Sequence, residues 1–162
     1  MSYPEARYHG EGGEVSAEMR PAADDPELKI GKLVEARYLA TGASTAGQFG
    51  LYRWDMMGPP SGAAPHFHRT ISESFFVLSG KVRLYDGEEW RDGSGGDFMY
   101  VPQGGIHGFR NESGAPASLL LLFVPGAPRE GYFETLAEVA AGRKLSPEEW
   151  TELYLRHDNI VV

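Results

Sequence analysis

The chain of 162 residues contains no cysteine, which excludes disulfide bonds and thiolate catalysis. It is also short of positive charge, because 15 Lys and Arg stand against 23 Asp and Glu and give a net charge of −8. This balance disfavours nucleic acid as a partner. No basic cluster or basic amphipathic stretch indicates binding to a membrane surface.

Long hydrophobic runs are missing as well. The longest covers residues 117–124, is interrupted by Ser118, and is far too short to cross a membrane. The first residues, Met1 to Glu5, are polar and acidic and lack the apolar region of a secretion signal. We therefore expect a cytoplasmic protein.

Glycine and proline, by contrast, are plentiful: 21 and 11 residues make up about a fifth of the chain, against roughly 12% in average proteins. Turn-rich sequences with short strands favour a sandwich or a barrel. The length suits one domain with a sizeable core. Strand-like runs occupy residues 32–40, 48–57, 74–78, 81–85 and 119–124. The sequence predicts an all-β domain.

Three of the five histidines stand at spacings typical of metal ligands. His66 and His68 are two residues apart, so on a strand both side chains point to the same face. Glu73 follows after a short connection, and His107 comes after the turn signal of residues 102–105. Three imidazoles and one carboxylate can hold a divalent metal and leave coordination positions free. They converge only if the strands wrap around a common interior.

This pattern resembles the two sequence motifs of the cupin family. The first motif is matched by His66, His68, Glu73 and Gly80, although Pro60 stands where the family has its leading glycine. The second motif is matched in full, by Gly96, Pro102, Gly104, His107 and Asn111. Residues 81–95 separate the two motifs, which is the short spacing usual in microbial cupins.

The resemblance implies a cupin fold, that is, a double-stranded β-helix or jelly-roll-like barrel. It also implies that His66, His68, Glu73 and His107 bind one divalent transition metal, which can be Fe, Mn, Ni, Co, Cu or Zn. The alternative is a cupin whose site is empty or occupied by something else.

The two ends of the chain differ in character from the barrel segment. Residues 1–28 are polar, which predicts an arm that is poorly ordered alone. Residues 130–141 place apolar side chains on one helical face, and Ser146 to Glu149 form a capping box that begins a second helix. We expect an N-terminal arm (1–28), a barrel (29–126) and a helical extension (127–162) packed on the outside or over an open end of the barrel.

The interior of the barrel should be largely apolar, although plain core packing is the simpler interpretation of each candidate wall residue. The candidate wall residues are Phe75, Phe98, Phe109, Met56 and Met57, with Tyr52 or Trp54. Such walls favour an aromatic or partly apolar ligand. The arginines that would bind an anion if they pointed inward are Arg37, Arg53, Arg69, Arg83 and Arg110. Exposure at the surface is the commoner arrangement for arginine.

Within the cupins, the chain is similar to bacterial single-domain quercetinase-like proteins, which cleave a flavonol or related enol with dioxygen. The strand Phe49 to Tyr52 and the passage from Phe123 to Phe133 add to this likeness. The resemblance implies a metal-dependent dioxygenase acting on a flavonol-like or other aromatic or enolic small molecule. The metal would hold the substrate oxygen and Glu73 would be the base, with a pKa raised by apolar surroundings.

Two other functions stay open. A metal-assisted isomerase, lyase or cyclase of a small-molecule or natural-product pathway would use the same site without dioxygen. A non-enzymatic small-molecule-binding cupin would need only the cavity.

The strand at 74–78 is apolar on both faces, whereas a strand with one face in water alternates with polar residues. The C-terminal helices or a second subunit must therefore cover its outer face. The polar arm can also add to the sheet edge of a partner. Together these features predict a homodimer.

Overall fold

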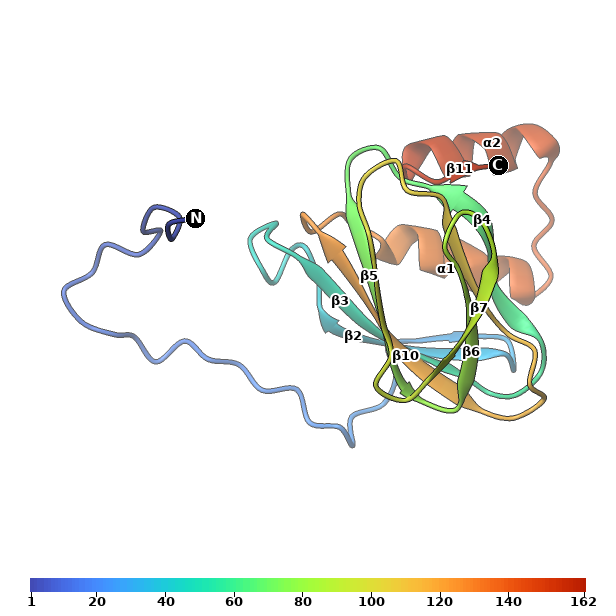
Figure 1. The fold of residues 1–162 in the computed structure, drawn as a ribbon, viewed down its shortest axis with the longest axis horizontal. Coiled ribbons are helices and arrows are strands. Elements are labelled where there is room, and N and C mark those ends of the chain that lie inside the picture. The colour runs from blue at the N-terminus through green and yellow to red at the C-terminus, as the bar shows by residue number, and fades with distance from the viewer.

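Two antiparallel sheets face each other and form a barrel (Figure 1). The computed structural model describes residues 1–162. The first sheet has the strand order β1-β2-β3-β10-β5-β8, and the second has the order β11-β4-β9-β6-β7. The strands are β1 (Leu28–Ile30), β2 (Val34–Ala40), β3 (Gly50–Met56), β4 (Ser61–Phe67), β5 (Ser72–Ser79), β6 (Lys81–Tyr85), β7 (Trp90–Ser94), β8 (Phe98–Val101), β9 (His107–Asn111), β10 (Ala117–Val124) and β11 (Ile160–Val161). This arrangement confirms the predicted double-stranded β-helix.

The core lies between the sheets because the strands alternate between buried and more exposed side chains. In β3 every second residue is buried, and these include Tyr52, Trp54 and Met56. The partner strand β10 contributes the buried Leu119 and Leu121, which pair with Trp54 and Tyr52. A period of two is what places one face of a strand in the interior. The predicted strand regions are therefore confirmed.

Two helices follow the last long strand, α1 (Glu130–Ala140) and α2 (Pro147–Arg156). The predicted capping box is present, since Ser146 Oγ accepts from Glu149 N at 3.2 Å and the Glu149 carboxylate accepts from Ser146 N at 2.8 Å. Phe133 of α1 packs on Tyr52 and Trp54, with ring centroids 5.3 and 4.9 Å apart. The helices lie together on one side of the barrel (Figure 1).

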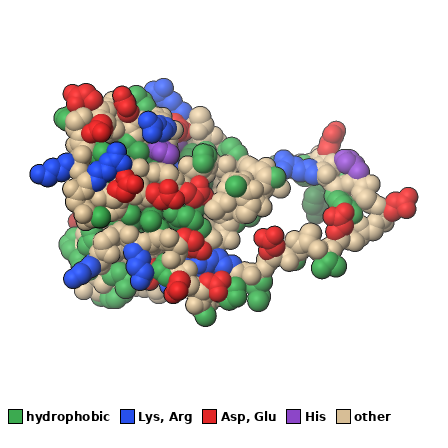
Figure 2. Space-filling view, turned by 180° about the vertical axis from the view of Figure 1, so that it is seen from behind, with side chains coloured by type: hydrophobic (Ala, Val, Ile, Leu, Met, Phe, Trp, Pro, Cys, Tyr) green, Lys and Arg blue, Asp and Glu red, His purple; other side chains and the backbone are tan.

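Residues 1–27 contain neither helix nor strand until β1 begins, and they extend away from the body of the molecule (Figure 2). The base of this segment is attached to the barrel. Arg20 pairs with Glu27 at 2.8 Å, and the Glu27 carboxylate accepts from Tyr38 N at 2.8 Å.

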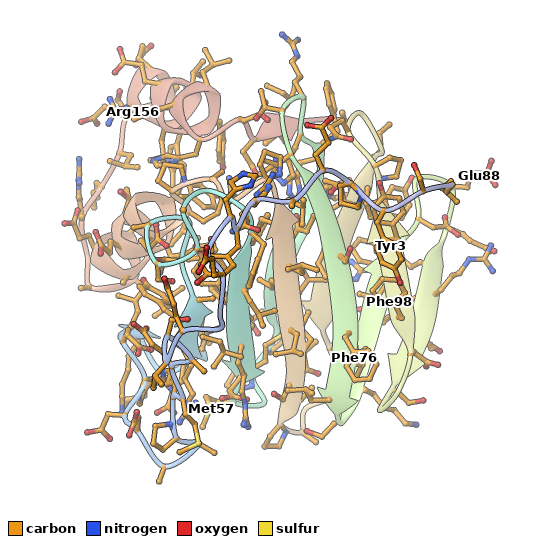
Figure 3. The ribbon with its side chains drawn as sticks, turned by 90° about the vertical axis from the view of Figure 1, so that its left-hand side faces the viewer. Tyr3, Met57, Phe76, Glu88, Phe98 and Arg156 are labelled. Atoms are coloured by element: carbon orange, nitrogen blue, oxygen red, sulfur yellow. The ribbon has the colours of Figure 1, made fainter.

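The C-terminal helices leave the outer face of β5 uncovered, so one of the two expected coverings is absent. Phe76 and Phe98 are register partners on β5 and β8 and lie on the outside of the sheet (Figure 3). Their exposed fractions are 39% and 62%, and Leu78 and Tyr100 beside them are exposed as well. The expectation that Phe98 lines the interior is therefore wrong, because the alternation of β8 turns Met99 and Val101 inward instead.

Candidate metal centre

Four buried side chains, those of His66, His68, Glu73 and His107, converge inside the barrel, and their ligand atoms all lie within 4.8 Å of one another. His66 and His107 are register partners on the neighbouring strands β4 and β9. His68 follows the end of β4, while Glu73 comes from β5 in the opposite sheet. The two sheets therefore both contribute to the cluster, as the wrapping of the strands required.

The carboxylate of Glu73 lies at the centre of this cluster. Its Oε2 atom is 2.9 Å from His107 Nε2 and 3.1 Å from His68 Nε2. The rings of His66 and His107 are 4.4 Å apart between centroids. Atoms so close together can share one small cation.

The other ring nitrogen of each histidine is held by a backbone carbonyl. His66 Nδ1 lies 2.8 Å from Ala64 O, His107 Nδ1 lies 2.9 Å from Gly105 O, and His68 Nδ1 contacts Asp158 O. A carbonyl oxygen only accepts, so each Nδ1 donates its hydrogen. In a neutral imidazole this leaves the Nε2 lone pair free. Three lone pairs and a carboxylate then face one another, and this donor set fits a divalent metal.

The protonation state of His66 agrees with that arrangement. Burial lowers the pKa of His66 to about 4, so its ring is neutral at pH 7. Burial alone would also lower the pKa of His107, but its hydrogen bond to Glu73 and the charge of Glu73 outweigh burial and raise it, and a metal would have to displace that proton. Burial alone would raise the pKa of Glu73, but hydrogen bonds from His107 and His68 and their charge bring it below its usual range. The two histidines thus outweigh the apolar surroundings from which we expected a raised pKa. Glu73 is ionised and available as a ligand.

Asp158 attaches the C-terminal segment to the ligands. Its carbonyl accepts from His68 Nδ1, and its carboxylate accepts from Arg69 N at 2.9 Å and from Thr70 N and Thr70 Oγ1 at 2.7 Å. The residue has a φ of 52°, in the left-handed region that Asp tolerates better than most residues. The chain then continues into β11, where Val161 pairs with His66.

Comparison with known proteins agrees with the fold and the ligand set. A model of the Cupin domain matches residues 54–123, which include all four side chains of the cluster. This segment is therefore similar to a cupin domain, and the two facing sheets have the cupin fold. An uncharacterized protein of Aquifex aeolicus is 38% identical over 61 residues, which cover 38% of this chain and 50% of that relative. The match thus spans half the length of that curated relative.

Solved structures of other proteins have the same fold. KdgF from a Halomonas species superposes with a TM-score of 0.60 at 15% identity, over 69% of this chain and 96% of its own. A predicted oxalate decarboxylase from Thermotoga maritima gives 0.59 at 19% identity, over 67% and 99%. The polyketide cyclase RemF from Streptomyces resistomycificus gives 0.53 at 18% identity, over 78% and 98%. At these identities the likeness shows the fold alone. Neither helix of this cupin is long and apolar enough to cross a membrane.

A cavity of about 210 Å³ opens onto His66 and Glu73 of the cupin. The barrel contributes Trp54, Phe109 and Phe123 to its walls, and the helices contribute Tyr132, Phe133, Trp150 and Tyr154. The extension therefore covers the mouth of the cavity, which was one of its two expected places. Trp54 and Phe109 are confirmed as wall residues.

The remaining expected wall residues lie elsewhere. Phe75, Met56 and Tyr52 are buried in the core of the cupin and are not part of the cavity wall, although Phe75 lies 5.7 Å from the His107 ring. Met57 is 45% exposed, because it follows the end of β3. Like Phe98, it was wrongly expected to line the interior.

None of the five arginines considered from the sequence lines the cavity. Four of them pair with carboxylates instead: Arg37 and Arg53 with Asp55, Arg83 with Asp92, and Arg110 with Glu112. Arg69 is exposed.

The arginine that does line the cavity is Arg129, which sequence reasoning missed. It occupies the N-cap of α1 and makes no side-chain cap there. A cation is unfavourable beside the positive end of a helix dipole. No local signal in the sequence showed that Arg129 would face the cavity, because this depends on how α1 docks on the barrel.

Proposed function

We propose that this cupin is a metal-dependent dioxygenase acting on a small aromatic or enolic molecule related to the flavonols. The observation that supports this most is the convergence of three imidazoles and one carboxylate beside an aromatic cavity, whose wall includes His66 and Glu73. A bound divalent metal would supply Lewis acidity and one-electron chemistry toward dioxygen.

The residues of the chain have separate tasks in this proposal. His66, His68 and His107 hold the metal, and the carbonyls on their Nδ1 atoms fix the ring orientations. The aromatic walls pack on the planar substrate, and the helices keep water out of the cavity.

Glu73 takes the proton from the enol hydroxyl of the substrate. It is ionised, so it can accept a proton, and its position between His68 and His107 puts it at the reacting end of the cavity. A pKa below the usual range makes it a weak base while both histidines contact it. A substrate that moves its carboxylate away from those rings would strengthen it as a base.

The size of the cavity favours the smaller members of the substrate class. Pockets for drug-sized ligands measure roughly 300–1,000 Å³, and this cavity holds about 210 Å³. A single hydroxypyranone ring, which is the reacting ring of a flavonol, therefore fits better than a three-ring flavonol.

In the same proposal, the three parts of the chain have different roles. The barrel (29–126) holds the metal centre, the extension (127–162) closes the cavity, and the arm (1–28) is free to contact a second copy in a homodimer.

The test combines metal analysis with oxygen uptake. Protein purified without added metal is analysed for its elements, and oxygen consumption is then followed with quercetin and with maltol, a monocyclic hydroxypyranone. We expect a bound transition metal and uptake that depends on substrate. Turnover of either compound without oxygen uptake would instead favour a metal-assisted isomerase, lyase or cyclase. Binding without turnover would favour a small-molecule-binding role.

Glu73→Gln tests the base within this proposal. At equal metal occupancy, the variant should bind substrate but turn over at least ~10²-fold more slowly, which is the usual contribution of a positioned acid or base. Glu130→Gln is the matched control, because Glu130 is also hydrogen-bonded, to Tyr52 Oη at 2.6 Å, but lies outside the cavity wall. Unchanged turnover in metal-loaded Glu73→Gln would remove Glu73 as the base.

A further inference from the structure

Arg129 is a buried cation without an anionic partner. Only 3% of its surface is exposed, and the one hydrogen bond of its guanidinium runs from Nη1 to His157 O at 2.6 Å. No carboxylate lies within ion-pair distance of the guanidinium, and Nε is fully buried without any hydrogen-bond acceptor. A buried charge normally has a partner, since burying it alone is costly. Arg37, by contrast, is only partly buried and has Asp55 as its partner.

The protein holds this guanidinium in one place. Its central carbon lies 5.0 Å from the ring centroids of Phe123 and of Tyr132. These ring faces attract the cation and offset part of the cost of its burial. An arginine carries five N–H donors, and a single carbonyl oxygen accepts from this one. The aromatic rings do not replace the missing acceptors, so most of the guanidinium N–H groups have no hydrogen-bond partner. The side chain is thus positioned in advance for a planar acceptor such as a carboxylate.

The same cavity connects Arg129 with the metal cluster. Both His66 and Glu73 share its wall with Arg129, and the negative charge of Glu73 acts on the guanidinium. Imidazoles bind a metal in their neutral form, so the three of them with one carboxylate and a divalent metal would carry one net positive charge. Arg129 adds a second positive charge to a cavity whose other polar wall groups, such as Tyr132 and Asn159, are neutral at pH 7. An anionic ligand would compensate this excess.

We propose that Arg129 binds an anionic group of the substrate, and that the substrate is an aromatic or enolic acid with its carboxylate on this guanidinium. Arg129 is then a specificity-determining residue that selects anions over neutral molecules of the same shape. The carboxylate part of this proposal rests on Arg129 alone. The orientation of the enol oxygen toward His66 and Glu73 rests on the proposed function.

The experiment compares benzoate with its neutral isostere benzamide. Their dissociation constants are measured by calorimetry on zinc-loaded protein and on protein stripped with a chelator. We expect the wild type to bind benzoate at least about 10-fold more tightly than benzamide. The preference for benzoate over benzamide should be larger with zinc, because the zinc charge then offsets the negative charge of Glu73, which otherwise offsets the positive charge of Arg129. A preference that persists in the stripped protein separates the role of Arg129 from that of the metal centre.

Two variants and a control assign the preference. Arg129→Met should weaken benzoate binding by about 10- to 100-fold, the range for losing a charged hydrogen-bond partner, and leave benzamide binding within about 3-fold. Arg129→Lys should lie between the two, since it keeps the charge but not the planar fork. The matched control is Arg110→Met, because Arg110 also stacks on an aromatic ring, Trp90, at 3.8 Å, yet has Glu112 as its partner.

The proposal is overturned if wild-type protein binds benzoate and benzamide equally. It is also overturned if folded Arg129→Met keeps the affinity for benzoate. If Arg129→Met does not fold, NMR of wild-type protein labelled with ¹⁵N-arginine replaces it. One guanidinium Nε–H resonance, protected from solvent exchange, should then shift on titration with benzoate and stay in place with benzamide, and an unshifted spectrum overturns the proposal.

Discussion

At the residue scale, each histidine of the cluster is fixed at Nδ1, which donates to a backbone carbonyl. The Nε2 atoms of His68 and His107 also contact the carboxylate of Glu73. Such a ring cannot turn away without losing a buried hydrogen bond, which costs about 1–3 kcal/mol. The site is therefore rigid before any ligand arrives, and rigidity of this kind favours tight metal binding.

His107→Ala should lower metal occupancy severely and leave the barrel folded. The change removes one of four ligands, so the loss of affinity should exceed the 10- to 100-fold typical of losing a group that only supports a ligand. Elemental analysis after dialysis against a weak chelator measures occupancy, and circular dichroism reports the strands. His157→Ala is the control, because His157 is outside the cluster. A barrel that unfolds in His107→Ala would make the site structural rather than functional.

The sequence predicts residues of the site unequally well. The four proposed ligands could be found from the sequence, because their spacing follows the period of a strand and the glycine and proline positions of two motifs. They are His66, His68, Glu73 and His107. Arg129 could not be placed in this way. Its position depends on how the extension docks over the barrel mouth, which is a tertiary relation that no local pattern carries.

At the element scale, residues 158–161, which include the short strand β11, hold residues 66–70, the segment that carries the ligands His66 and His68. We call residues 158–161 the clamp. Ile160 and Val161 pair with Phe67 and His66, and Asp158 holds the backbone of residues 69 and 70. The sequence did not predict β11, because two residues are too few to show a period. The longer strands and both helices were predictable from alternation and from the capping box.

Asp158→Ala should lower metal affinity by about 10- to 100-fold, because the clamp positions His68 without itself contacting the metal. Alanine removes the carboxylate and also disfavours the left-handed backbone at this position. Asp158→Asn keeps one acceptor oxygen and the backbone preference, so its effect should be smaller. Competition with a chromogenic chelator measures both affinities.

Asp97→Ala provides the comparison for the clamp. Its carboxylate likewise accepts from a backbone N–H, that of Ser94 at 2.8 Å, but in a turn outside the metal cluster and the cavity wall. Equal metal affinity in Asp158→Ala, Asp97→Ala and wild type would show that the clamp does not position the ligand.

At the scale of the whole molecule, the exposed apolar face of β5 and β8 is the main unexplained surface of the barrel. It is shared by Phe76, Leu78, Phe98 and Tyr100. Exposed apolar patches of this kind often serve protein–protein association. The second of the two coverings expected from the sequence, another subunit, is therefore the one we propose.

Light scattering coupled to size exclusion should show a dimer that Phe98→Lys converts to a monomer. Because Phe98 is 62% exposed, the change should leave the fold intact. Leu155→Lys is the control, since Leu155 is 64% exposed on α2, away from the patch. A wild-type protein that is monomeric at every accessible concentration would rule out the dimer.

The contact between His68 and Asp158 spans 90 positions of the sequence. A ribosome completes all four ligands by residue 107, yet the carbonyl that fixes the His68 ring is made about fifty residues later. During synthesis, the His68 ring is therefore made well before the carbonyl that holds it. We expect the four proposed ligands to reach their final geometry only when residue 158 docks, late in the folding of the chain.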